Sequence, residues 1–137
     1  MYSSMFESTT IPMLQEVLNF AEARHTVLAG NIANLDTPGY KVRDLSVDDF
    51  QTRLKEAIQQ SHQPPAPRSP GEPDQEEDLM FAKVSEDPKS ILYHDNSNVG
   101  LEYQVTEMVK NQIQHNLALS LLTSQFHMLR AAISGQV

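Results

Sequence analysis

The stretch LEYQVTEMVKNQIQHNLALSLLTSQFHMLRAAIS, residues 101–134, decides the fold class of this chain. Mostly apolar residues recur along it at alternating steps of four and three, which is the spacing of a long helix that packs against a partner helix. At about 1.5 Å per residue, such a helix is a rod roughly 50 Å long. Gly135 predicts its C-terminal end. The recurring positions, called here the predicted seam, are Leu101, Val105, Met108, Gln112, His115, Leu119, Leu122, Phe126, Leu129 and Ile133.

A second helix with the same spacing is predicted near the N-terminus, over residues 11–35. Thr10 is placed to be its N-cap, and Pro12 suits the first turn because its missing N–H needs no partner there. Together the two helices predict a mainly α fold in which a coiled-coil-like pair forms one helical core domain. The seam positions of the N-terminal helix are Ile11, Leu14, Leu18, Ala21, His25, Leu28, Ile32 and Leu35.

The N-terminal helix is predicted to end in the tight turn Asn-Leu-Asp-Thr-Pro-Gly, residues 34–39. Pro38 disfavours helical geometry at Thr37, and Gly39 accepts a positive φ. Proline and glycine at the two central positions favour a type II turn. Helix and turn together make up the N-terminal unit, residues 1–45.

Three segments separate this unit from the C-terminal helix of residues 101–137. Residues 61–78 hold five of the eight prolines and five acidic side chains, so they predict a flexible acidic linker. Residues 79–100 predict an irregular or short-strand arm. Residues 46–60 predict a short amphipathic helix with Val47, Phe50, Leu54 and Ile58 on one face, and with Ser46 and Asp49 spaced as in a capping box.

The composition argues against several classes of function. The formal net charge is -8, whereas binding nucleic acid requires a basic surface. There are no cysteines, so disulfides and cysteine-based metal sites are excluded. No apolar run approaches the roughly 18–20 residues that span a bilayer, and the first residues lack the apolar region of a cleaved secretory signal. No Ser/His/Asp arrangement, phosphate loop or carboxylate pair is present, so we expect neither an enzyme nor a bound cofactor.

A second apolar row, called here the outer row, follows the C-terminal helix at steps of four. Because each step advances about 40° around the helix, the row moves away from the predicted seam. One partner helix cannot cover both, and an exposed patch of this size is rare on a monomer. Burial between subunits is one solution, and a monomeric bundle in which residues 46–60 cover the row is the other. The outer row consists of Val105, Val109, Ile113, Leu117 and Leu121.

The string Asn-Ile-Ala-Asn-Leu-Asp-Thr-Pro-Gly-Tyr-Lys, residues 31–41, closely resembles the signature of the flagellar axial proteins, which are rod, hook and hook-associated subunits. The short chain without an inserted globular domain is similar to a proximal rod subunit of the basal body. The C-terminal run from Asn111 through Phe126 to Gly135 agrees with this resemblance. The resemblance extends over residues 12–58 and 92–135.

This resemblance implies a subunit that self-assembles into a helical tube, whose inner wall is a coiled coil of paired N- and C-terminal helices. It implies a place in the periplasmic rod of the bacterial flagellum, where the subunit would transmit torque for motility. Export would use the flagellar type III apparatus without a cleaved signal. The implied partners are other rod subunits, the membrane-supramembrane ring and the small adaptor between ring and rod. The alternative functions are an acidic helical adaptor or export chaperone, monomeric or dimeric, and a metal-binding bundle.

The signature residues have two interpretations. Asn31, Asn34 and Asp36 either contact a neighbouring subunit or bond nearby backbone groups at the helix end. Thr37, Pro38 and Gly39 form a rigid turn on either interpretation. Tyr40 either docks on a neighbour or shields this turn.

The polar seam residues His25, Gln112 and His115 are expected to fix the helix register at a cost in stability. The alternative is a small helix rotation that brings them to water. A metal site at His25 and His115 is disfavoured, because no carboxylate or cysteine completes a ligand set.

Phe50 and Leu54 resemble the short hydrophobic signal by which rod and hook subunits engage the export gate, although core packing of the short helix is the favoured interpretation. The predicted assembly interface combines apolar positions of both long helices: Leu14, Leu18, Leu28, Ile32, Val109, Ile113, Leu117, Leu121, Leu122, Phe126 and Leu129.

Overall fold

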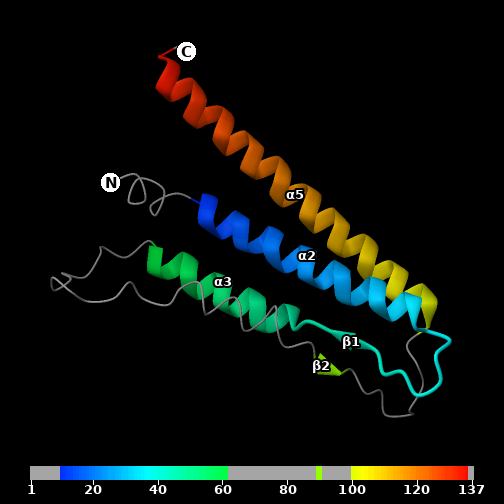
Figure 1. Cartoon of the computed structure of the whole chain (residues 1–137). Coiled ribbons are helices and arrows are strands. Elements are labelled where there is room, and N and C mark those ends of the chain that lie inside the picture. Colours follow the sequence, from blue (N-terminus) through cyan, green and yellow to red (C-terminus); the bar gives the residue numbers. More distant parts are fainter. Residues whose placement is uncertain (1–9, 62–88, 91–99, 136–137) are drawn as a thin grey trace, which may run out of the picture.

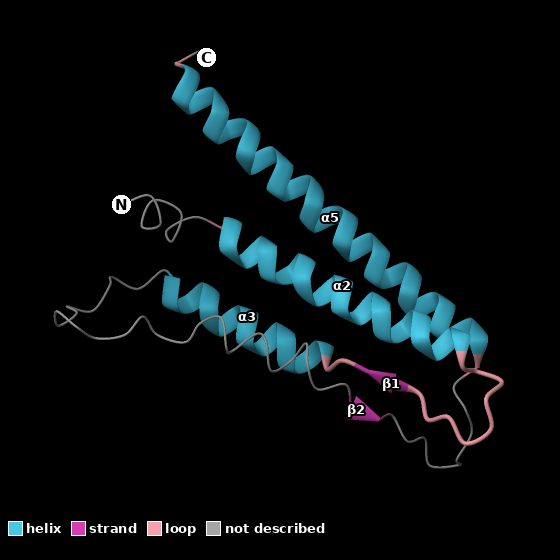
Figure 2. Ribbon diagram, in the orientation of Figure 1, coloured by secondary structure: helices cyan, strands magenta, loops and turns pink. Residues whose placement is uncertain are grey.

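The computed structural model describes residues 10–61, 89–90 and 100–135 of the chain. In chain order the described elements are α2 (Ile11–Ala33), β1 (Arg43–Asp44), α3 (Val47–Ser61), β2 (Lys89–Ser90) and α5 (Leu101–Ser134). Helices make up most of this part of the chain (Figure 2). The prediction of a mainly α fold with two long helices and a shorter third one is confirmed.

The two long helices form an antiparallel pair (Figure 1). Asn31 near the end of α2 bonds Gln104 at the start of α5, whereas Ala21 in the middle of α2 bonds Asn111 further along α5. With 34 residues against 23, α5 is the longer helix, and its C-terminal part runs past the first residue of α2. That end of α5 therefore has no partner among the described elements.

The short helix α3 lies on the opposite side of α2 from α5 (Figure 1). Phe20 of α2 and Phe50 of α3 stack with ring centroids 4.0 Å apart and planes 8° from parallel. Leu45 completes this small core, and it is surrounded by half-buried apolar side chains of α2 and α3. The alternative in which residues 46–60 cover the outer row of the C-terminal helix is therefore wrong.

Strand β1 lies in the connection between α2 and α3 and pairs antiparallel with β2, Arg43 opposite Ser90 and Asp44 opposite Lys89. The strand β2 falls within residues 79–100, for which the sequence predicts an arm. The rest of that arm and nearly all of the acidic linker predicted at 61–78 lie outside the described residues.

The helix ends follow local sequence signals. Thr10 occupies the N-cap position of α2 and Pro12 its first turn, although no hydrogen bond from the Thr10 side chain caps the helix. Ser46 Oγ accepts from the backbone N–H of Asp49 at 3.2 Å, which is the expected N-cap bond of α3. Gly135 ends α5 with φ 63°, a left-handed conformation that glycine adopts without strain.

Candidate assembly interface

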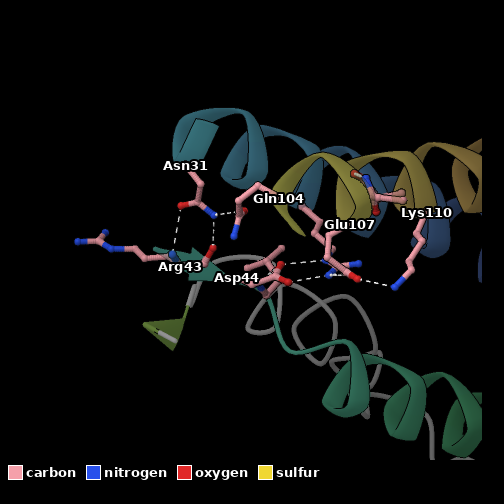
Figure 3. Close-up of polar contacts among 10 residues, drawn as sticks. Asn31, Arg43, Asp44, Gln104, Glu107 and Lys110 are labelled. Carbon is pink, nitrogen blue, oxygen red and sulfur yellow. Dashed lines mark hydrogen bonds and ion pairs between the residues drawn. The ribbon is translucent and has the colours of Figure 1, made fainter. Parts of the chain in front are cut away.

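A fully buried asparagine, Asn31, joins three parts of the subunit at the end of α2 (Figure 3). Its side-chain nitrogen donates to the carbonyl oxygen of Arg43 at 2.6 Å and to Oε1 of Gln104 at 3.1 Å. Its side-chain oxygen accepts from the backbone N–H of Arg43 at 3.1 Å and from the hydroxyl of Tyr40 at 3.2 Å. Both donor hydrogens and both acceptor positions of the amide are therefore in use.

These bonds separate the roles of the three signature residues. The partners of Asn31 all lie within the subunit, and the most distant, Gln104, is 73 residues away along the chain. Asn34 bonds locally, its Nδ2 donating to the carbonyl oxygen of Gly30 at 2.8 Å. Asp36 is exposed. The first asparagine is thus a long-range joint, the second belongs to the helix end, and the aspartate faces solvent.

The turn after α2 has the predicted geometry. The backbone N–H of Tyr40 donates to the carbonyl oxygen of Thr37 at 3.1 Å, and Gly39 has φ 78°. This bond and a positive φ at the third position define a type II turn. Residues 36–39 are all exposed, so the turn forms a solvent-facing tip at one end of the helix pair.

Arg24 is a second buried polar centre, only 5% exposed. Its Nε and Nη2 donate to the two carboxylate oxygens of Asp44 at 2.8 and 2.6 Å. Nη2 also donates to Oε2 of Glu107 at 2.8 Å, and Lys110 donates to Oε1 of Glu107 at 2.7 Å (Figure 3). A balanced cluster of two cations and two carboxylates therefore links α2 to β1 and α5.

The cluster favours the charged form of each member for which a pKa shift is evident. The hydrogen bonds to Asp44, and to a lesser degree those to Glu107, raise the pKa of Arg24 against the opposing effect of burial. Hydrogen bonds from Lys110 and Arg24 lower the pKa of Glu107 below its ordinary value of 4.5. The same bond to Glu107 raises the pKa of Lys110. The ion pairs are thus formed at neutral pH.

One line of α5 residues faces α2, and it is more polar than the sequence predicts. These nine residues, called here the inner face, are the buried or half-buried residues of α5, and every other described residue of the helix is exposed. Apart from Glu107, successive members again alternate steps of four and three. The inner face consists of Gln104, Glu107, Met108, Asn111, His115, Ala118, Leu122, Gln125 and Leu129.

The predicted seam of the C-terminal helix is therefore wrong as the surface that faces α2. Met108, His115, Leu122 and Leu129 belong to the inner face, but the other six positions are exposed. The physical reason is that Arg24 and Asn31 of α2 bond side chains of α5 that lie beside the apolar seam. The exposed positions are Leu101, Val105, Gln112, Leu119, Phe126 and Ile133.

The prediction for the polar seam residues is also partly wrong. His25 and Gln112 are exposed, so neither can fix the register of the helix pair. Gln112 instead donates to Asn116 on the next turn of α5 at 3.0 Å. His115 does lie between the helices, and its Nδ1 is buried without a hydrogen-bond partner in the described part of the chain.

The outer row is exposed along its whole length on α5. All five members are aliphatic and are between 44% and 62% exposed, with Ile113 at the upper limit. Phe126, 51% exposed, borders a shallow apolar hollow with Leu129 and Ile133. Apolar side chains thus cover the outside of a helix whose inner face is largely polar.

The other residues of the predicted assembly interface are buried or half-buried. Leu28 is only 1% exposed and offers no surface to another molecule. The half-buried members are Leu14, Leu18, Ile32, Leu122 and Leu129. The two residues that resemble an export signal lie elsewhere, because Phe50 is buried against Phe20 and Leu54 packs beside it.

The sequence carried an unused signal for the buried polar residues. Arg24 and Asn31 are seven residues apart on α2, and Gln104, Asn111 and Gln125 repeat at multiples of seven on α5. Polar residues at heptad spacing share one face of each helix, and this spacing is compatible with a polar interface as well as with a solvent-facing surface.

Comparison with known proteins assigns a family to this arrangement. A family model described as "Flagella basal body rod protein" matches residues 18–41, which hold most of α2 and the turn after it. FlgB of Escherichia coli, a flagellar basal body rod protein, is 32% identical over 126 residues, covering 81% of this chain and 83% of that protein. The chain belongs to the FlgB family of flagellar basal body rod proteins.

Other FlgB proteins match as fully. The flagellar basal body rod protein FlgB of Salmonella typhimurium is 30% identical, with 88% of this chain and 90% of that protein covered. FlgB of Bacillus subtilis is 28% identical, with 93% and 95% covered. As a FlgB protein, the chain is a structural subunit of the rod in the flagellar basal body, with other rod components as partners. None of the described helices is long and apolar enough to cross a membrane.

Proposed function

We propose that this FlgB protein joins the proximal rod through the outer row of α5, and that its role there is mechanical. The observation that carries the proposal is that five aliphatic side chains at four-residue spacing stay exposed on a helix that already pairs with α2. A row with this spacing forms a ridge that packs into the groove of another helix. We infer that helices of neighbouring rod subunits supply that groove.

The energy available from the outer row suits an assembly with several contacts per subunit. Full burial of an aliphatic side chain is worth roughly 1.5–3 kcal/mol, and about half of that is still to be gained at each position. Five positions then supply about 4–8 kcal/mol. Association costs roughly 4–15 kcal/mol, so the row alone gives weak pairwise binding. A tube in which each subunit contacts several neighbours would overcome this cost and transmit torque through interlocked helices.

Finer partners are part of the same proposal. The exposed turn at residues 36–39 is held rigidly by the bonds of Asn31 and Tyr40, so it is suited to contact a neighbouring subunit without further ordering. We also infer contacts with the membrane-supramembrane ring and the ring-to-rod adaptor, and export through the type III apparatus. If Phe50 and Leu54 engage the export gate, they do so in an unfolded chain, since Phe50 is buried in the fold.

The proposal is tested by substitution in the centre of the outer row. Ile113→Glu adds a charge to the most exposed member of the row, and burial of an unpaired charge between subunits is strongly unfavourable. We expect normal helix content of the purified chain but loss of rod incorporation and motility in cells that depend on this copy. The matched control is Gln114→Glu on the adjacent exposed residue. Normal incorporation of the Ile113 variant would refute assembly through the outer row.

A further inference from the structure

Apolar residues surround so much of α5 that hydrophobic burial alone does not select the face that meets α2. The inner face and the predicted seam share Met108, His115, Leu122 and Leu129. Most of the other predicted seam positions are replaced in the inner face by the residue next to them in sequence, which lies about 100° away around the helix. Since about half of the positions are shared, the two surfaces differ by a rotation of the helix of roughly 50°. That rotation would bury Leu119 and expose Ala118, giving α2 a more apolar partner surface. The structure nevertheless has Leu119 47% exposed and Ala118 3% exposed.

Three directional bonds on successive turns of α5 oppose this rotation. Gln104 accepts from Asn31 at 3.1 Å, Glu107 accepts from Arg24 at 2.8 Å, and Asn111 donates to the carbonyl oxygen of Ala21 at 2.7 Å. Rotation would separate all three pairs. Arg24 and Asn31 would then stay buried with fewer partners, which costs more than the apolar contacts return.

The polar line also has a cost in stability. Asn111 is 2% exposed, and its Oδ1 is buried without a hydrogen bond from the described residues. Nδ1 of His115, one turn further along, is in the same condition. A buried polar group without a partner destabilises a fold by about 1–3 kcal/mol. Leucine, which has the same branched shape as asparagine but is larger, would carry no unpaired polar group at position 111.

We propose that Asn111, together with Gln104, is a specificity-determining residue that fixes the rotation of α5 so that its apolar rows face outward. The inference rests on the proposed function, because an outward apolar face is useful only to a subunit that assembles. A polar amide at a helix interface can specify one arrangement at the expense of stability, and here it keeps α2 from covering the side chains that neighbours require. Asn111 and Gln104 are the informative positions because they supply two of the three bonds, and alanine at both removes these bonds without adding an apolar side chain to the inner face.

The test uses single cysteines in the full chain, which has no cysteine of its own. Leu119→Cys and Ala118→Cys report the two adjacent positions that exchange exposure on rotation. In the parent background we expect the thiol at 119 to react at least about tenfold faster than the thiol at 118. Alanine at both Gln104 and Asn111 removes two of the three bonds without adding an apolar side chain to the inner face, and it should bring this ratio to about one or reverse it while the chain stays helical. Alanine at both Gln114 and Asn116, the same two changes on exposed residues of α5, should leave the ratio unchanged.

Two results would overturn the proposal. One is an unchanged ratio in a fully helical protein with alanine at both Gln104 and Asn111. The other is a loss of helix content, because the two amides would then be required for folding and not for the choice of face. Labelling of the purified chain does not depend on rod assembly. An unchanged ratio would leave assembly through the outer row intact, whereas normal incorporation of Ile113→Glu would remove that function and leave the labelling result standing.

Discussion

Asn31 in α2 donates a side-chain hydrogen to Gln104 in α5 at 3.1 Å, and its second amide hydrogen bonds the backbone of β1. One residue thereby ties the first helix, the strand after the turn and the last helix together. This joint explains why asparagine stands at this position of the signature string, because the residues that follow it turn the chain back towards the same side-chain amide.

The first prediction concerns this joint. Asn31→Ala removes four hydrogen bonds and leaves the buried side chain of Gln104 and the backbone groups of Arg43 without those partners. We expect a loss of about 2–4 kcal/mol in the free energy of unfolding, measured by denaturation followed by circular dichroism. Asn34→Ala, which removes one local bond, should cost less than about 1 kcal/mol. Equal losses of unfolding free energy in the two variants would contradict the role of Asn31 as a joint.

Sequence patterns fixed the limits of the long helices well but not their rotation. Leu101 and Ser134 bound α5 as the heptad spacing and Gly135 predict. The face that meets α2 was mispredicted because two neighbouring lines on α5 both satisfy that spacing, and the more apolar line was preferred. Directional bonds to Arg24 and Asn31 decide between them, and the strength of such bonds depends on geometry that spacing does not contain.

The role of Asn31 could likewise not be predicted from the sequence. Its main partners are the backbone groups of Arg43, and any residue except proline at position 43 would offer them. Only the path of the turn brings those groups to the helix. Phe50 shows the opposite case, because its amphipathic spacing on a short helix predicted a core position, and it stacks on Phe20.

The second prediction is that the free energy of unfolding depends on pH through the ionisation of Glu107. Its pKa is lower in the folded chain than the ordinary 4.5, so its stabilisation is fully present above that pH and is lost as the pH falls through the folded value. Glu107→Gln should cost about 1–3 kcal/mol at neutral pH, because a buried partner of Arg24 loses its charge. The difference in free energy of unfolding between the variant and the parent should decrease below pH 4.5. Glu56→Gln on the exposed face of α3 should reproduce neither effect. If the difference between the Glu107 variant and the parent stayed constant across this pH range, Glu107 would not be the group that causes the pH dependence.

The third prediction concerns the turn after α2. Among the described residues, leaving out the two chain neighbours of Gly39, no heavy atom lies within 4 Å of the place where its Cβ would be, so the obstacle to substitution here is its φ of 78°. Gly39→Ala should cost about 1 kcal/mol, Gly39→Asn less because asparagine tolerates this region, and Gly39→Val more because of its branched Cβ. Thermal melting measures the order, and motility of the valine variant tests its consequence. A valine variant as stable as the parent would rule out the type II turn.

The last prediction separates two roles of Phe50, in the core and in export. The ring stacks on Phe20 at 4.0 Å, and both residues are 5% exposed. Phe50→Ala should lower the free energy of unfolding by about 3–5 kcal/mol, and a double-mutant cycle with Phe20→Ala should give a coupling of at least about 0.5–1.5 kcal/mol. Phe50→Leu keeps an apolar side chain and should cost less. If export recognition is the main role, Phe50→Ala would instead melt like the parent and reduce secretion, while Phe20→Ala would leave secretion unchanged. Destabilisation with normal secretion would assign Phe50 to the core alone.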